Sequence, residues 1–177
     1  ITVNHRLNAF GYLYLDRLLP GAFPDSGNAG QWDLVLALDW VKANARAFGG
    51  DPARVMVFGQ SGGGAKIATL MATPAARGLF QAAATMSGQQ VTASGPLNAT
   101  RRAEAYLARL GLAKADASVL KTMPMAKLIE ALDARDPLDS SQGLYFGPVL
   151  DERMLTRHPF WPDAPAQSAN IPMILGN

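Results

Sequence analysis

The pentapeptide Gly59-Gln60-Ser61-Gly62-Gly63 is the segment of the sequence whose residue types and spacing point most directly to chemistry. It matches the pattern Gly-x-Ser-x-Gly, in which a serine on a tight turn acts as a nucleophile. An apolar run at 55–58 before it is typical of a buried strand, and a helical pattern at 64–73 follows it. We expect the turn to be so sharp that Gly59 and Gly63 have no room for a Cβ. We therefore predict that Ser61 is a nucleophile and that the start of the helix offers N–H groups to an oxyanion.

A glycine-rich turn between a strand and a helix can also be a phosphate-binding loop. Such a loop ends in a lysine that is followed by serine or threonine. Here Lys66 is followed by Ile67, so the pattern favours the nucleophile.

A serine nucleophile needs a base, which is nearly always histidine, and the sequence has two histidines. His5 lies in an apolar run, so we expect a hydrogen-bonded histidine of the core. His158 follows Ser61 and could complete a triad in the order serine, acid, histidine. The candidate acids for that triad are Asp136, Asp139, Asp151 and Glu152. The alternative is that the acid and the base both lie outside this chain.

Hydrophobic periodicity and the positions of glycine and proline predict the helices and strands that hold these residues in place. The patterns predict strands at 1–5, 55–58, 82–86 and 171–177. They predict helices at 31–48, 64–73, 99–112, 115–122 and 125–134, and mostly loop over 136–168. Strands that alternate with helices predict an α/β fold with a largely parallel sheet and flanking helices.

The composition excludes several other classes of protein. Hydrophobic residues make up 49% of the chain and charged residues 17%, which is too apolar for a disordered chain. The net charge is +2 and the basic residues are scattered, so no nucleic-acid surface is indicated. No apolar stretch reaches the roughly 18 residues that indicate a membrane span. The absence of cysteine excludes disulfides and thiolate chemistry.

Several blocks of the sequence, taken in order, resemble the type B carboxylesterase family, which includes cholinesterases and bacterial carboxylesterases. Besides the Ser61 turn, the blocks are VNHRLNAFG at 3–11, GNAG at 27–30, FGGDP at 48–52, GLF at 78–80, SG at 87–88 and PVLD at 148–151. The resemblance implies a partial α/β-hydrolase domain over residues 1–177 that lacks its N- and C-terminal parts. It also implies hydrolysis of small-molecule carboxylic esters through an acyl-serine intermediate, with no metal and no cofactor.

The resemblance also assigns roles to individual residues. Ser61 becomes the acyl-accepting nucleophile, and the N–H of Gly62 becomes a donor of the oxyanion hole. Ser87 matches a supporting serine that helps to hold the catalytic acid, although a serine that merely closes a strand is the alternative. In the family's order the acid and the histidine come after a strand like residues 171–177, hence beyond Asn177. We therefore expect the chain to be an internal fragment that is inactive in isolation.

Two departures from the family pattern leave other functions open. Gln60 stands where the family usually has glutamate, and Gly62 stands where it usually has alanine. One alternative is a catalytically silent, cholinesterase-like interaction module, against which the intact serine turn argues. Another is a serine hydrolase of amides, thioesters or lactones, which the same turn would serve.

Overall fold

The computed structural model describes all 177 residues, which form two compact units. The first unit comprises Ile1–His5, Gln31–Ala93 and Leu150–Asn177. The second comprises Arg6–Gly30 and Ser94–Val149. Each unit has its own cluster of buried apolar side chains.

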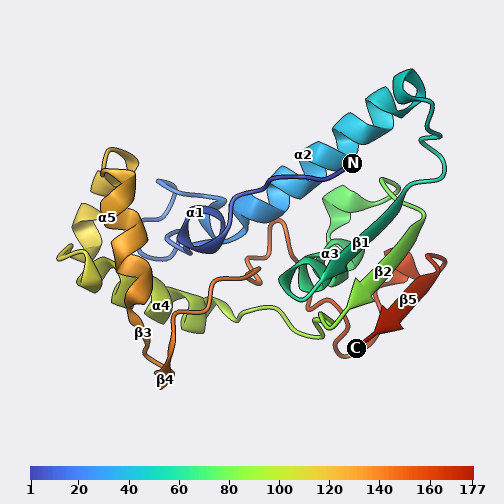
Figure 1. Ribbon diagram of the computed structural model, residues 1–177. Coiled ribbons are helices and arrows are strands. Elements are labelled where there is room, and N and C mark those ends of the chain that lie inside the picture. Colours follow the sequence, from blue (N-terminus) through green and yellow to red (C-terminus); the bar gives the residue numbers. More distant parts are fainter. The chain divides into compact units, whose positions relative to one another are not determined.

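A parallel sheet of three strands, in the order β1-β2-β5, forms the centre of the first unit (Figure 1). Its strands are β1 (Met56–Gln60), β2 (Ala82–Met86) and β5 (Met173–Gly176). The predicted α/β class with a parallel sheet is therefore confirmed. The strand predicted at 82–86 has the observed bounds, and those predicted at 55–58 and 171–177 differ by one or two residues at their ends.

The strand predicted at residues 1–5 is wrong. Residues 1–4 are exposed and residue 5 is half-buried, and none of them belongs to a strand. A β-strand requires a neighbour to pair with its backbone N–H and C=O groups. No strand of the sheet pairs with this segment, so its apolar side chains alone do not make it a strand.

Two helices and the sheet share the core of the first unit. Helix α2 (Ala29–Asn44) continues as the 3₁₀ segment η2 (Ala45–Phe48), which confirms the helix predicted at 31–48. It stops at Gly49, whose φ of 77° is left-handed and suits a residue without a Cβ. Helix α3 (Gly62–Ala72) follows β1 directly. The side chains that meet in this core include Val35, Leu38, Ile67, Leu70, Met71 and Ala83.

The other face of this sheet is open. Along β1 the side chains alternate, and Met56 and Phe58 are 47% and 69% exposed. Phe58 is in register with Ala84 of β2, and Ala84 with Ile174 of β5, which is 67% exposed. Because Ala83 faces the core and neighbours along a strand point to opposite faces, these residues line one apolar surface on the far side.

The loop-rich segment after residue 150 is ordered by side chains that bind backbone groups. One carboxylate oxygen of Asp151 accepts the N–H groups of residues 153–155 at 2.9 to 3.1 Å. Farther along, the Ser168 hydroxyl donates to the Met71 carbonyl oxygen at 2.6 Å, next to the short 3₁₀ helices η3 (Pro74–Ala76) and η6 (Ala166–Ser168). The Ser168 bond ties this segment, which has no long helix, to the end of α3.

The second unit is mainly helical. Its elements are α1 (Asn8–Tyr12), η1 (Ser26–Asn28), α4 (Pro96–Arg109), η4 (Lys114–Lys121), α5 (Met125–Glu130), η5 (Ala131–Asp133), β3 (Arg135–Asp136) and β4 (Asp139–Gly143). The helices predicted at 99–112 and 125–134 are confirmed, and the one predicted at 115–122 is a 3₁₀ helix. The antiparallel pair β3–β4 lies where mostly loop was expected. None of the helices of the chain has the length and hydropathy needed to cross a membrane.

Buried polar groups of the second unit form hydrogen bonds with its backbone. Tyr106 is 1% exposed, and its hydroxyl donates to the Leu128 carbonyl oxygen at 2.7 Å. Burial raises the pKa of Tyr106 to about 12. Asn28 is fully buried and bonds both backbone groups of Val149, accepting its N–H at 3.0 Å and donating to its carbonyl at 2.8 Å. Two distant segments are thereby joined with all of these polar groups paired.

A largely buried ion pair joins α4 and β3. The Arg102 Nε lies 2.6 Å from a carboxylate oxygen of Asp136, and the two side chains are 17% and 5% exposed. Burial by itself raises the pKa of the Asp136 carboxyl, but hydrogen bonds from Leu138 N–H, Arg102 and Tyr145 N–H outweigh it. The pKa therefore lies below its usual value. The stabilisation from the charged carboxylate is complete above about pH 4 and is lost as the pH falls below it.

We predict that Arg102→Met lowers the free energy of unfolding by about 3 kcal/mol, because it leaves the buried Asp136 charge without its partner. Denaturant unfolding of the full-length protein at pH 7 measures the change. The matched control is Arg109→Met, whose pair with Asp133 is 50% and 63% exposed and which should change stability little. Equal effects of the two substitutions would contradict the structural role of the buried pair.

Candidate active site

Ser61 stands at the junction of β1 and α3, with its backbone held in a strained conformation. Its φ of 51° and ψ of −120° lie in a region that residues with a side chain rarely adopt. Its N–H donates to the Met86 carbonyl oxygen at 2.7 Å, and its own carbonyl accepts the Ala65 N–H at 3.0 Å. The sharp turn predicted from the sequence is therefore present, and Ser61 is exposed on it.

Three glycines make this junction possible by letting backbones touch. A Cβ on Gly59 would lie 2.6 Å from the Gly63 carbonyl carbon, and one on Gly64 would lie 3.1 Å from the Gly59 carbonyl oxygen. A Cβ on Gly88 would lie 2.1 Å from the Ser61 carbonyl oxygen. The structure therefore confirms that Gly59 has no room for a Cβ.

The expectation that Gly63 has no room for a Cβ is wrong, because an added Cβ there meets nothing within 4 Å. The helix turns the Cα–Cβ direction of residue 63 away from the strand and brings residue 64 against it. Sequence reasoning therefore missed the contact roles of Gly64 and Gly88. For Gly64, its position directly after the motif was a signal that the sequence offered. For Gly88, only the pairing of β1 with β2 reveals the contact.

Gly62 is the first residue of α3, so its N–H has no acceptor within the helix. This N–H directly follows Ser61, at the positive end of the helix dipole. An oxyanion that forms on a group attached to Ser61 could accept a hydrogen bond from it. The Lys66 Nζ lies on the same turn and donates to the Gly62 carbonyl oxygen at 3.3 Å.

Ser87 follows β2 as Ser61 follows β1. It also has a left-handed φ of 51°, and its N–H donates to the Gly176 carbonyl oxygen of β5 at 2.8 Å. Because the strands are parallel and adjacent, the two serines lie at the same end of the sheet. Ser87 therefore does close a strand, and whether it also supports a catalytic acid stays a prediction.

His5 is half-buried, and its Nε2 is a buried atom without a hydrogen-bond partner. The expectation of a hydrogen-bonded histidine is wrong for this nitrogen. Burial and the nearby Lys66 ammonium lower the pKa of His5, against a smaller opposite effect of Asp33. The lowered pKa favours the neutral imidazole, and His5 forms no hydrogen bond with Ser61.

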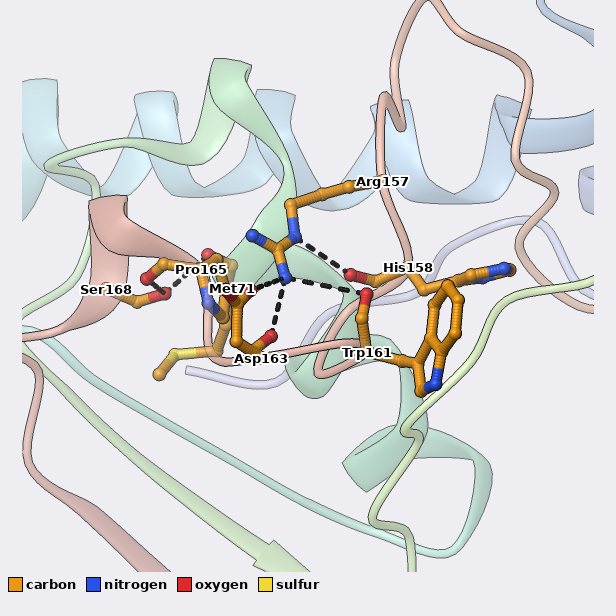
Figure 2. A network of polar contacts seen from close by, with 7 residues as sticks. All are labelled: Met71, Arg157, His158, Trp161, Asp163, Pro165 and Ser168. Carbon is orange, nitrogen blue, oxygen red and sulfur yellow. Dashed lines mark hydrogen bonds and ion pairs between the residues drawn. The ribbon is translucent and has the colours of Figure 1, made fainter.

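His158 has a structural contact rather than a bond to the nucleophile. Its Nδ1 accepts the Ala93 N–H at 3.1 Å, and its ring meets the Trp161 ring edge-on with the centroids 5.8 Å apart. Figure 2 shows Arg157 beside it, with donated bonds to the His158 carbonyl oxygen at 3.2 Å and to the Asp163 carboxylate at 2.6 Å. These bonds fix the loop that carries the imidazole.

The acids proposed for a triad with His158 have other roles. Asp136 binds Arg102, and Asp139 accepts bonds from the backbone and hydroxyl of Ser141. Asp151 binds the backbone of the residues that follow it, and neither it nor Glu152 forms a hydrogen bond with His158. The structure does not assemble a serine–acid–histidine triad within this chain. It also brings no three histidine, aspartate or glutamate side chains together as a metal site.

Comparison with known proteins shows which family this chain matches. The profile of the carboxylesterase family matches residues 1–177. The para-nitrobenzyl esterase of Bacillus subtilis is 38% identical over 99% of this chain and 36% of its own length. A neuroligin-like protein of Caenorhabditis elegans is 33% identical over 99% of this chain and 25% of its own length.

A solved carboxylesterase structure is also similar to this chain in fold. A crystal structure of a Geobacillus stearothermophilus carboxylesterase superimposes with a TM-score of 0.84 at 35% identity. The superposition covers 98% of this chain and 35% of that one. The chain thus spans about a third of the length of the esterases that it matches.

We predict that Gly88→Ala lowers the free energy of unfolding by about 3 kcal/mol, because its Cβ collides with backbone atoms that cannot move independently. The matched control is Gly63→Ala, which should be neutral or stabilising by up to about 1 kcal/mol because alanine favours the helix. Denaturant unfolding of the full-length variants measures both. A Gly88→Ala protein as stable as Gly63→Ala would show that the close approach at the serine turn is absent.

Proposed function

Since this chain belongs to the carboxylesterase family, as its sequence blocks had indicated, we propose that the protein hydrolyses small-molecule carboxylic esters through an acyl intermediate on Ser61. The observation that carries the proposal is the exposed serine in a strained backbone conformation between β1 and α3. Strain of this kind persists where the surrounding structure imposes it, and functional sites are where it concentrates.

In the proposed reaction the Ser61 Oγ attacks the carbonyl carbon of the ester while a histidine takes its proton. The negative charge of the tetrahedral intermediate develops on the former carbonyl oxygen, where the Gly62 N–H donates to it. The C–O bond to the alcohol then breaks, and the histidine returns the proton to the leaving alcohol. Water attacks the acyl-serine by the same route, releasing the acid and regenerating the Ser61 hydroxyl.

The proposal takes the base and the acid from outside residues 1–177. Neither His5 nor His158 forms a hydrogen bond with Ser61, and the His158 Nδ1 already accepts the Ala93 N–H. The chain matches about a third of the length of the esterases compared with it. The other two thirds of their length can contain both the acid and the base. Ser87, next to the nucleophile at the same sheet end, is the residue that we assign to holding the acid.

The open face of the sheet supports the view that these residues are part of one larger catalytic domain. Met56, Phe58 and Ile174 expose much of their apolar surface there. Exposed apolar patches of this kind mark surfaces that contact further protein. We therefore propose that residues 1–177 are a partial α/β-hydrolase domain.

A catalytically silent interaction module is the second candidate. Gln60 in place of the usual glutamate is compatible with it. Ser61 and its strained turn argue against it, because a silent module has no need to maintain backbone strain around an exposed hydroxyl. Cleavage of amides, thioesters or lactones would use the same groups, and substrate profiling separates these from esters.

We predict that Ser61→Ala in the full-length protein lowers kcat for a p-nitrophenyl ester by about 10⁴-fold or more, since no other group accepts the acyl chain. Ser118→Ala is the control, because Ser118 is an exposed serine of η4 that the proposed reaction does not use. It should lose far less activity. Labelling by a fluorescent organophosphonate, followed by peptide mapping, should mark Ser61 alone.

Retention of more than about a tenth of the wild-type rate by Ser61→Ala would sink the nucleophile assignment. Absence of both labelling and hydrolysis in the wild-type protein would favour the interaction module. Both substitutions replace an exposed residue, so both proteins should fold.

The isolated 177-residue chain should give no burst of p-nitrophenol, because its serine lacks a base. Burst amplitude measured against protein concentration, beside the full-length protein, tests this. A stoichiometric burst that His158→Ala abolishes would instead establish a base within the chain.

A further inference from the structure

Lys66 places a positive charge at the start of α3. It opens the second turn of α3, and its side chain points back so that the ammonium sits at the first turn. A positive charge near a helix N-terminus is opposed by the helix dipole. The side chain is also half-buried, and burial lowers the pKa of its ammonium, so the charged form is destabilised in the folded protein.

The turn that Lys66 contacts is made of glycines, whose backbone is flexible. Three consecutive glycines, Gly62, Gly63 and Gly64, open α3 immediately after Ser61. Glycine weakens a helix by about 1 kcal/mol per residue relative to alanine, because its backbone has more freedom to lose. Only Gly64 is required by a close contact, since a Cβ on Gly63 meets nothing and one on Gly62 meets only the Lys66 Nζ at 3.6 Å.

The peptide groups around the nucleophile are held by separate bonds. The Ser61 N–H is held by the Met86 carbonyl oxygen at 2.7 Å. On the other side, the Lys66 ammonium donates to the Gly62 carbonyl oxygen at 3.3 Å. The Gly62 N–H, the donor of the oxyanion hole in the proposed function, lies between these two anchored points. The Ser61 carbonyl of the same peptide group accepts the Ala65 N–H at 3.0 Å, so the direction of the Gly62 N–H depends on that bond as well as on these two.

We propose that Lys66 is a positioning residue for the reaction at Ser61: its ammonium braces the glycine turn through the Gly62 carbonyl and so keeps the Gly62 N–H aimed at the oxyanion. This inference rests on the proposed function. It assigns to Lys66 an effect on the transition state, in which the oxyanion is formed, and not on substrate binding.

The central test is Lys66→Met in the full-length protein, which keeps the length of the side chain and removes the charged donor. Loss of an entire oxyanion donor lowers kcat by about 10²–10³-fold, so loss of a brace should lower it by about tenfold. KM should stay within about twofold of wild type. The rate constant for labelling by an organophosphonate should fall in step with kcat. The melting temperature should not fall, because a desolvated ammonium is removed.

Two further variants control for charge and for general effects of substitution. Lys66→Arg keeps a charged donor and should retain at least about half of the wild-type kcat. Lys127→Met removes an exposed lysine of α5 and should match the wild type in every measurement. A kcat of Lys66→Met within about twofold of wild type would overturn the inference, as would a loss of kcat accompanied by a lower melting temperature.

A double-mutant cycle with Gly62→Ala tests the bracing itself. Alanine restricts the backbone at residue 62, and its Cβ meets the Lys66 Nζ only at ordinary contact distance. In this background Lys66→Met should lower kcat by no more than about threefold, because the turn no longer needs the brace. An equal loss in both backgrounds would overturn the role. Wild-type protein that fails to be labelled at Ser61 would instead show that the proposed function is wrong.

Discussion

The close crossing of three backbone segments is the constraint on which the rest of the first unit depends. The Ser61 carbonyl oxygen lies so near the Cα of Gly88 that no side chain fits between them. Strand β2 must end at that point and β1 must turn there, so the parallel pairing of these strands and the entry into α3 are set together. The strain at Ser61 is a consequence of the same crossing, because the N–H bond to Met86 holds the serine against the end of the neighbouring strand. Exposure of its hydroxyl follows from this backbone geometry.

Irregular segments in both units are ordered by polar side chains that bind backbone groups. In the first unit, Asp151 gathers three N–H groups and Ser168 binds the carbonyl of Met71. In the second, Asn28 satisfies both backbone groups of Val149. Such bonds are strong where water is excluded, because an unpaired buried donor or acceptor costs about 1–3 kcal/mol. They connect segments without regular secondary structure to the rest of each unit.

The proposed function assigns one half of the chemistry of a serine hydrolase to this chain. The chain supplies the strained serine and the N–H at the start of α3, which are properties of the backbone around Ser61. A serine hydroxyl alone is a weak nucleophile, and the proton transfer that activates it requires a histidine in contact. The His158 Nδ1 accepts the Ala93 N–H, and the His5 Nε2 has no hydrogen-bond partner. Under the proposed function, Ser61 would carry the acyl group, and another histidine would move the proton.

The sequence by itself determined the elements that local patterns control. Periodicity and punctuation located β1, β2, β5 and the long helices within a few residues, and the motif around Ser61 located the turn, because these depend on neighbours in the chain. Tertiary structure decided what depends on distant neighbours. Residues 1–5 have the composition of a strand but no partner to pair with. Gly63 lies in the motif yet has open space, whereas Gly88, far along the chain, receives the closest contact, because the pairing of parallel strands brings their ends together.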